Sequence, residues 1–275
     1  MSLSGRNALF RVGIAFCALS ALIVLAASFL IIPDYPAIQE DIRRPGDFFL
    51  FFLGSLFSSN YLAVHIAIIM TVLFSLLGII LILSYFEQTS AHEILYIAFF
   101  TISFSFETIR LIIPLSLIYD IPSFYLLVAA KILIFTRFFG LFSLFAASIY
   151  AAGLEVQMTR YVIMVLIAAT LVLTGVPVDT QNRDSSFNIV YGFNTMYRLI
   201  EAVAFIITVI SFFIAVNIRG SKEYALIGVW LMIALAGRYF LLYSDNWAGP
   251  ILGILMLSIG TWFVCSKLHK IYLWL

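Results

Sequence analysis

The chain consists of long apolar runs separated by short polar links. A membrane-spanning helix needs about 20 apolar residues, and eight runs reach or approach that length. They are Phe10–Ile32, Tyr61–Tyr85, Ile94–Leu117, Phe124–Tyr150, Tyr161–Leu173, Met196–Val216, Ala225–Tyr243 and Pro250–Cys265. The fifth and eighth runs are short, so we expect the fifth to begin in the preceding link and the eighth to continue into SKLHKIYLWL. The pattern predicts an all-α, polytopic integral membrane bundle of about eight transmembrane helices.

The links divide the chain into three parts. Residues 1–32 form an N-terminal tail and the first span, residues 33–60 an outer loop, and residues 61–275 a bundle of seven spans. The outer loop contains an apolar stretch, Asp47–Phe57, that is too short to span. We expect this stretch to lie along the membrane surface as an interfacial helix or to extend the second span. A seven-span alternative, in which a short run is merged or lost, would place the termini on opposite sides.

Basic residues in the links favour one orientation, because Lys and Arg are enriched on the cytoplasmic side of membrane proteins. With the N-terminus inside, seven lie on the inner side and three on the outer side. The inner set is Arg6, Arg11, Arg160, Arg219, Lys222, Lys267 and Lys270, and the outer set is Arg43, Arg44 and Arg183. We therefore expect both termini in the cytoplasm, in a multi-pass protein of a bacterial plasma (inner) membrane.

Composition agrees with a membrane protein and removes several functional classes. The chain is 64% hydrophobic and 11% charged, whereas a soluble domain is about one quarter charged. The formal net charge of +1 gives no basis for nucleic-acid binding. The common hydrolase, nucleotide and zinc motifs are absent from the sequence, and the predicted topology separates His65 from His92 and His269. We expect no metal, no cofactor and no catalytic residue.

Charged residues inside the apolar runs are the most informative feature of the sequence. Each costs roughly 2.5–3.5 kcal/mol at the centre of a span, and seven are present. They are Glu107 and Arg110 in the third span, Lys131 and Arg137 in the fourth, Arg198 and Glu201 in the sixth, and Arg238 in the seventh. With a rise of about 1.5 Å per residue, the predicted topology places them all at mid-depth or in the outer half. This common depth predicts a polar pocket open to the outside.

The spacing of these charges predicts two pairs, each on one helix face. Glu107 and Arg110 are three residues apart, and Arg198 and Glu201 repeat this spacing in reverse order. Lys131, Arg137 and Arg238 then lack an acidic partner within the spans. The five basic and two acidic residues sum to a formal +3, which an anionic ligand would offset. Polar residues that could complete the pocket are Tyr191, Tyr197, Tyr239, Tyr243, Asp245 and Asn246.

Two other interpretations of the charges stay open. The pairs could lock helices together and do nothing more, or the charges could line a path for protons or ions. Pro114 lies one turn beyond Arg110, where a proline kinks a helix and helps to open a cavity. Prolines also occur in spans without a functional role.

The function that this pattern favours is binding rather than catalysis. We expect a membrane-embedded, sensor-type protein whose outward-facing cationic pocket takes a small anion or an anionic lipid headgroup, since arginine suits carboxylate and phosphate. The first alternative is a transporter or flippase of an anionic solute or lipid. The second is an intramembrane enzyme acting on a lipid-linked phosphate, with Glu107 or Glu201 as general base. Membrane lipids and a membrane-protein partner are the other expected contacts.

Overall fold

The computed structural model describes residues 3–34, 58–89 and 91–273. Its elements are α1 (Leu3–Ile31), η1 (Ile32–Asp34), α4 (Tyr61–Phe86), α5 (Glu93–Ser103), η2 (Phe104–Leu111), α6 (Ile112–Ile118), α7 (Ser123–Ala151), η3 (Val156–Met158), α8 (Thr159–Thr174), β1 (Val178–Arg183), β2 (Ile189–Tyr191), α9 (Asn194–Arg219), α10 (Glu223–Tyr243) and α11 (Ala248–Leu273). The η elements are 3₁₀ helices. In this part of the chain, eight helical spans are long and apolar enough to cross a membrane, which confirms the predicted count.

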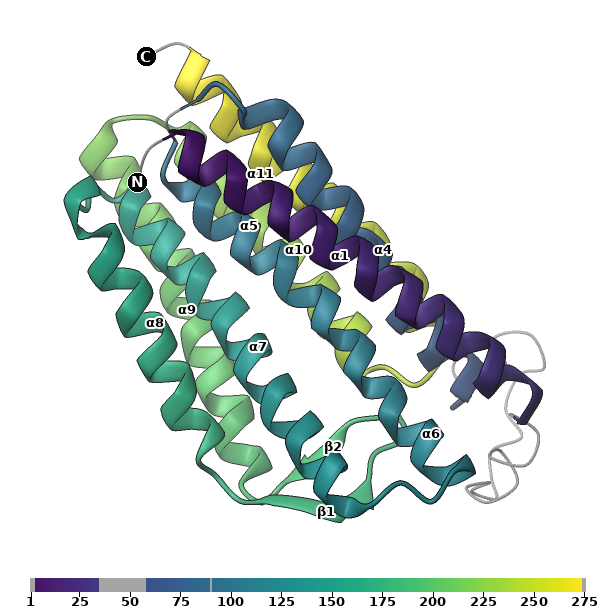
Figure 1. Cartoon of the computed structure of the whole chain (residues 1–275). Coiled ribbons are helices and arrows are strands. Elements are labelled where there is room, and N and C mark those ends of the chain that lie inside the picture. The colour runs from purple at the N-terminus through teal and green to yellow at the C-terminus, as the bar shows by residue number, and fades with distance from the viewer. Residues whose placement is uncertain (1–2, 35–57, 90, 274–275) are drawn as a thin grey trace.

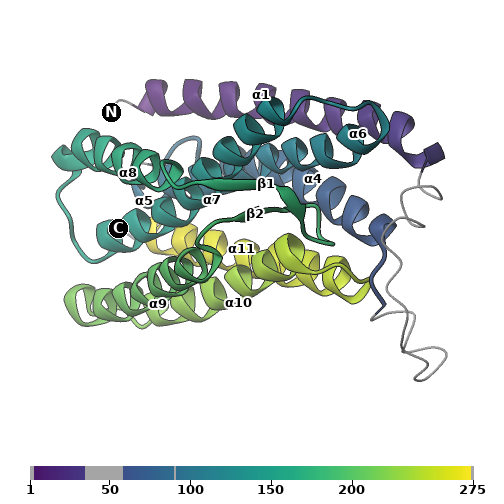
Figure 2. The ribbon, with the colours of Figure 1, turned by 90° about the horizontal axis from the view of Figure 1, so that it is seen from below.

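The spans form an elongated bundle with two distinct ends (Figure 1). The N- and C-termini lie at one end, which we call the terminal face, and the antiparallel hairpin of β1 and β2 lies at the other, which we call the hairpin face. Seen along the direction of Figure 2, the hairpin crosses the middle of the molecule, with α1 on one side and α9 and α10 on the other. The termini therefore share a face, as an even number of spans requires.

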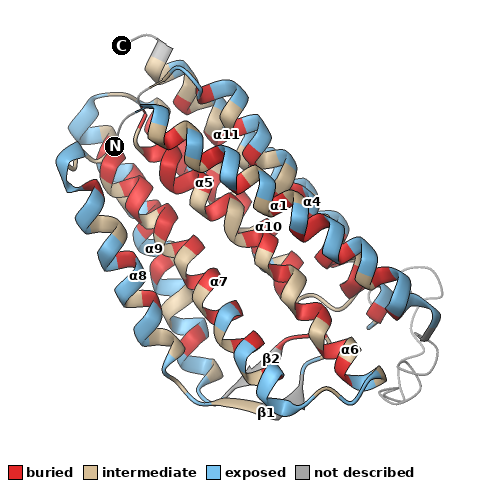
Figure 3. Ribbon diagram, viewed as in Figure 1, coloured by how far each residue is buried: buried red, intermediate tan, exposed pale blue. Residues whose placement is uncertain are grey.

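Burial follows the position of each helix in the bundle. In Figure 3 the buried residues concentrate on α5, α7 and α10, whereas α8 and α9 are largely exposed. The exposed side chains of these outer helices are apolar, for example Val172 on α8 and Leu199 on α9. Such side chains suit contact with lipid rather than with water. The most buried span is α7 and the least buried is α8, so α7 forms the centre of the fold and α8 its edge.

Glycines permit the closest helix packing in the structure, between α10 and α11. A Cβ added at Gly237 would lie 2.5 Å from the backbone nitrogen of Leu257 and 2.7 Å from the carbonyl oxygen of Gly253. A Cβ at Gly260 would lie 2.7 Å from the backbone nitrogen of Ala234. Small residues let helix backbones approach closely in membranes, so these glycines allow α10 and α11 to pack backbone against backbone.

Basic side chains cap three helix C-termini, where unpaired carbonyl groups carry a partial negative charge. Arg6 donates to Phe86 O and Thr89 O at the end of α4, at 2.6 Å each. Arg219 donates to carbonyls at the end of α7 at 3.2 and 3.4 Å. Lys131 donates to Thr174 O and, at 2.5 Å, to the carbonyl of residue 176 at the end of α8.

Two sequence predictions differ from the structure or lie outside it. The link between the fifth and sixth spans contains the β-hairpin, which the all-α expectation missed. The apolar stretch of residues 47–57 and the basic residues at 43 and 44 lie outside the described residues, so the interfacial-helix prediction is not tested. The orientation of the termini also stays a prediction.

Candidate functional site

Five charged side chains from four spans meet near the hairpin face. They are Glu107 and Arg110 on η2, Arg137 on α7, Glu201 on α9 and Arg238 on α10, and we call them the arginine–glutamate cluster. The sequence predicted that these helices would turn their charged faces toward one another, and for these five residues they do. The side chain of Glu201 is 18% exposed and the others 7% or less.

The centre of the cluster is a two-point ion pair between Glu107 and Arg137. Arg137 Nε donates to Glu107 Oε1 at 2.8 Å, and Arg137 Nη2 donates to Glu107 Oε2 at 2.6 Å. Arg110 Nη1 lies farther from the same carboxylate, at 3.6 Å. Parallel hydrogen bonds between guanidinium and carboxylate are stronger and more directional than single ones. The principal partner of Glu107 is therefore on another helix, and the expected pair within the helix is its weaker contact.

A second ion pair adjoins the first. Arg238 donates to one carboxylate oxygen of Glu201, and the hydroxyl of Tyr243 donates to the other at 3.0 Å. Arg238 Nη2 also donates to the backbone carbonyl of Arg137 at 3.3 Å. The guanidinium of Arg137 lies over the ring of Tyr243, 5.9 Å from its centroid, where a cation–π interaction is favourable. The two pairs thus form one connected network.

The local backbone of η2 explains how Glu107 and Arg110 come to point the same way. Residues three apart eclipse in a 3₁₀ helix, and runs of this length are uncommon. Pro114 has no N–H group, so the carbonyl of Arg110 lacks its usual α-helical donor. Ser105 Oγ and Thr108 Oγ1 donate to carbonyls three residues back, at 2.7 and 2.8 Å, and such bonds compete with α-helical ones. The sequence predicted a kink at Pro114, and the structure has a 3₁₀ segment that ends at Leu111, just before this proline and beside the buried charges.

The tip of the hairpin, residues 184–188, covers the cluster. Arg110 donates to the backbone carbonyl of Ser186, and Arg137 Nη2 donates to Asn188 Oδ1 at 2.8 Å. The amide of Asn188 in turn donates to Ser186 Oγ at 2.8 Å and to Leu242 O at 2.9 Å. Sequence reasoning missed Ser186 and Asn188, because a short polar link carries no signal of where it folds.

Apolar packing holds the same tip in place. Phe187 is 2% exposed and lies in a hydrophobic cluster with residues of α1, α4 and α7. Its ring stacks on that of Tyr61, with centroids 5.3 Å apart. The backbone of Phe187 has a φ of 54°, a conformation that costs a bulky residue energy. Burial of the ring compensates for this strain, so the tip is held by both an apolar and a polar anchor.

Little free space remains at the cluster. A cavity of about 20 Å³ lies against Arg137, Glu201 and Arg238, and one water molecule needs about 10–15 Å³ by this measure. The expected pocket open to the outside is therefore closed in this structure. Three arginines and two glutamates leave the cluster with a formal charge of +1, rather than the +3 expected from all seven charges.

Three predicted site residues are not members of the cluster, although Tyr197 and Arg198 line the small cavity beside it. Lys131 caps α8, and the hydroxyl of Tyr197 donates to Leu173 O of the same helix end at 2.6 Å. Arg198 is exposed and makes no ion pair within the described part of the chain. The expected pair of Arg198 with Glu201 is wrong, because the carboxylate of Glu201 pairs with Arg238 of α10 instead. Arg137 and Arg238, expected to lack acidic partners, each have one.

Of the residues suggested as completing the pocket, Tyr243 donates a hydrogen bond to the cluster. Asp245 Oδ2 accepts hydrogen bonds from Ser59 and Ser185, each at 2.7 Å. It therefore holds the hairpin tip through Ser185 and does not contact the cluster through these bonds. Tyr239 is 54% exposed, and Asn246 accepts from the backbone of Gly249 at 3.0 Å. The side chain of Tyr191 lies outside the described residues. No group of three metal-binding side chains occurs in the described ranges.

Comparison with known proteins gives one similarity. The chain is 20% identical over 259 residues to an uncharacterized protein of Treponema pallidum (strain Nichols), and the match covers 76% of this chain and 75% of that protein. No model of a known protein family matches the sequence. The similarity extends over most of both chains without indicating an activity, so the argument for function comes from the site itself.

Proposed function

We propose that the chain is a membrane-embedded, receptor-like binding protein for a small anion or an anionic lipid headgroup. Its site is the arginine–glutamate cluster, and the ligand enters from the hairpin face. The conformation described above is the closed one. We place the hairpin face outside the plasma membrane of a bacterium and both termini in the cytoplasm. The basic residues of the links are more numerous on the side of the termini, as is typical of the cytoplasmic side.

The observation that carries the proposal is the contact between the hairpin tip and the cluster arginines. Ser186 O and Asn188 Oδ1 accept hydrogen bonds from Arg110 and Arg137. Carboxylate and phosphate oxygens bind the same donors, and they bind them more strongly because they are charged. The tip therefore occupies the position of the ligand, and an anion that displaces it exchanges neutral acceptors for charged ones.

The charge of the cluster supports the same ligand class. Its formal charge is +1, and an uncompensated charge inside a membrane protein is expensive. A singly charged anion or phosphodiester headgroup would bring the sum to zero. A monoanion is therefore favoured over a neutral or cationic ligand.

The two alternative functions are supported less well. An enzyme needs a base that can reach its substrate, and both oxygens of Glu107 already accept hydrogen bonds from Arg137. A transporter needs a polar route to the opposite face. The interior between the cluster and the terminal face is filled by a hydrophobic core that includes Phe100, Leu141 and Leu144.

Binding measurements on variants test the proposal. A protein whose binding-competent form is rare binds with an affinity reduced by that fraction. Asn188→Ala removes the hydrogen bonds that hold the tip, so we expect it to bind acetate, phosphate or dihexanoyl phosphatidylglycerol about tenfold more tightly. Asn217→Ala, at an exposed position of α9, is the matched control and should bind as the parent does. Isothermal titration calorimetry in detergent gives the affinities.

Arg137→Gln and Arg238→Gln, each combined with Asn188→Ala, test whether the cluster arginines bind the anion. Both should abolish the binding gained in Asn188→Ala, whereas Arg160→Gln, at an exposed position of α8 away from the cluster, should not change it. The proposal is wrong when Asn188→Ala binds none of the three anions, or when adding Arg137→Gln or Arg238→Gln leaves the affinity of Asn188→Ala unchanged.

A further inference from the structure

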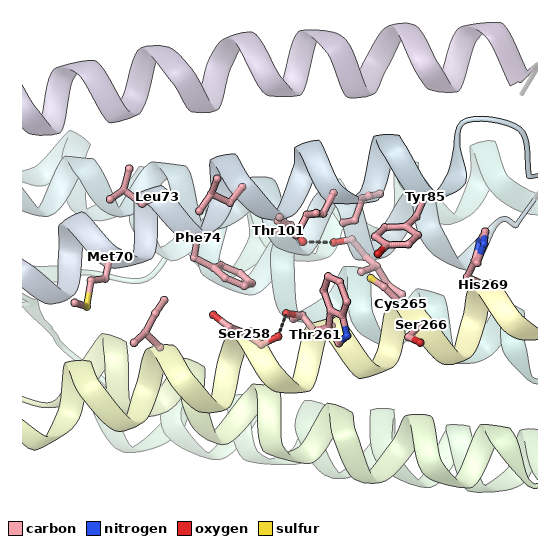
Figure 4. Close-up of a pocket in the computed structure, with 17 residues that line it drawn as sticks. Met70, Leu73, Phe74, Tyr85, Thr101, Ser258, Thr261, Cys265, Ser266 and His269 are labelled. Carbon is pink, nitrogen blue, oxygen red and sulfur yellow. Dashed lines mark hydrogen bonds between the residues drawn. The ribbon is translucent and has the colours of Figure 1, made fainter.

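A long groove runs between α4 and α11, with α5 as its floor. Its volume is about 430 Å³, within the range of about 300–1,000 Å³ that small-molecule sites occupy. Figure 4 shows the lining side chains along both helices, from Met70 at one end to His269 at the other. The groove contains none of the arginine–glutamate cluster, so it is a separate feature of the fold.

Most of the groove is apolar and lies within the spans. Leu73, Leu77 and Leu81 line it from α4, and Ile254 and Trp262 line it from α11. Leu77 is 60% and Trp262 is 49% exposed, so this surface faces outward from the bundle. At the depth of a span, the medium around the protein is the hydrocarbon of the lipid. An apolar furrow on such a surface is accessible to a hydrocarbon chain.

The length of the groove suits one extended chain. Met70 and Tyr85 are 15 residues apart on α4, which corresponds to about 22 Å at 1.5 Å per residue. One leaflet of a bilayer is about 15 Å deep. A chain that fills the groove from the terminal face therefore lies straight and reaches beyond the centre of the membrane, which favours long chains over short ones.

Polar groups gather at the end of the groove nearest the terminal face. Tyr85, Ser266 and His269 line this end, and Figure 4 shows all three at the same side of the view. The ring of His269 meets Tyr85 edge-on at 5.7 Å and Phe86 at 5.4 Å. Its Nδ1 atom is buried without a hydrogen-bond partner in the described part of the chain. The polar end of the groove therefore contains a histidine nitrogen whose hydrogen-bonding capacity the described residues do not satisfy.

The charge beside the polar end is positive. Lys267 and Lys270 flank His269 in the sequence, and both contact Glu223, at 2.9 and 3.8 Å. Two lysines and one glutamate leave a formal +1, and the side chain of Lys270 is 60% exposed. Basic residues at a cytoplasmic membrane surface attract anionic lipids. The groove thus combines an apolar length, a polar end and a local positive charge.

We propose that the groove between α4 and α11 binds one acyl chain of an anionic phospholipid, with the headgroup at Tyr85, Ser266 and His269. This lipid binds at the terminal face, whereas the proposed anion site lies under the hairpin face. The inference therefore stands whether or not the cluster binds an anion.

Native mass spectrometry of the full chain tests this site. The protein is reconstituted in nanodiscs of dioleoyl phosphatidylcholine and dioleoyl phosphatidylglycerol at equal amounts, and is then released from them. We expect one phosphatidylglycerol to stay bound, preferred about tenfold over phosphatidylcholine. Ser258→Phe places a ring in the groove and should remove the bound lipid. Ser84→Phe, at an exposed serine of α4 that does not line the groove, is the matched control and should keep it.

A second variant tests the headgroup without filling the groove. Tyr85→Phe combined with His269→Phe keeps the aromatic contacts and removes the polar atoms, so one lipid should stay bound while the preference for phosphatidylglycerol falls to about equal. Two results overturn the proposal. In the first, Ser258→Phe and Ser84→Phe retain lipid equally. In the second, the parent is a dimer without bound lipid and Ser258→Phe makes it monomeric, because the groove then holds a second copy of the chain.

Discussion

Glu107→Gln is the most informative single change in the protein, because it removes one charge from the centre of the cluster and keeps the shape of the side chain. The carboxylate of Glu107 is 2% exposed and accepts two hydrogen bonds from Arg137. Glutamine can accept only one of them, and its NH₂ group would face a guanidinium donor. The formal charge of the cluster would rise from +1 to +2.

The expected loss follows from these contacts. Breaking a buried ion pair by removing one partner costs about 3–5 kcal/mol in free energy of unfolding. Glu201→Gln is the matched comparison, because Glu201 is 18% exposed and lies beside a water-sized cavity. Water can then solvate the arginine left behind, so we expect a loss of about 1.5–3 kcal/mol, the range for hydrogen bonds to charged groups. Glu107→Gln should therefore be clearly the more damaging of the two.

The double variant Glu107→Gln with Arg137→Gln separates the ion pair from the rest of the site. It returns the formal charge of the cluster to +1, so we expect it to be more stable than Glu107→Gln alone. The measurement is equilibrium unfolding by dodecyl sulfate in mixed micelles, followed by the fluorescence of the four tryptophans. The expectation is wrong if Glu107→Gln and Glu201→Gln lower the free energy of unfolding by the same amount, below about 1 kcal/mol as for exposed pairs. It is also wrong if the loss in the double variant equals the sum of the losses in Glu107→Gln and Arg137→Gln.

Three further changes test other parts of the structure. Asn188→Ala should cost about 1–3 kcal/mol and speed amide hydrogen exchange in the hairpin, with Asn217→Ala unchanged as the control. Lys131→Met should cost about 1 kcal/mol and speed exchange at the end of α8 without changing anion binding, since this lysine caps a helix. Gly237→Ala should cost about 1–3 kcal/mol or more, because its Cβ would meet backbone atoms of α11; normal stability would mean that the two helices separate easily.

The spans could be predicted because a helix that crosses a membrane needs about 20 consecutive apolar residues. Each apolar run of suitable length became a helical span, and even the two short ones extended as expected, to Val156–Thr174 and Ala248–Tyr272. The depth of the charged residues could be predicted for the same reason, because position along a span fixes depth. The charges of four helices were predicted to lie at similar depth, and five of them meet there.

The partners of those charges could not be predicted, because spacing along one helix gives no information about its neighbours. Glu107 has Arg110 three residues away, yet its shorter contacts are to Arg137 on α7. Glu201 has Arg198 at the same spacing, yet it binds Arg238 on α10. The rotation of each helix about its axis decides between such partners, and packing across the whole bundle sets that rotation.

The hairpin was missed for a different reason. The sequence VDTQNR of β1 is polar and that of β2 has three residues, so neither gives the alternating pattern of a half-buried strand. Its tip is ordered by contacts with residues far along the chain, such as Tyr61 and Asp245. Those contacts exist only after the bundle has formed.

The 3₁₀ segment η2 has a mechanical consequence for the third span. A 3₁₀ helix rises about 2.0 Å per residue and an α-helix about 1.5 Å, so the eight residues of η2 make this span about 4 Å longer than an unbroken α-helix. Rewinding them would shorten the span by that amount and turn α6 by about 160° relative to α5, at about 20° for each residue. Glu107 and Arg110 lie within the segment that would rewind. The contacts of Glu107 with α7 and of Arg110 with the hairpin tip therefore also hold the third span at its longer length.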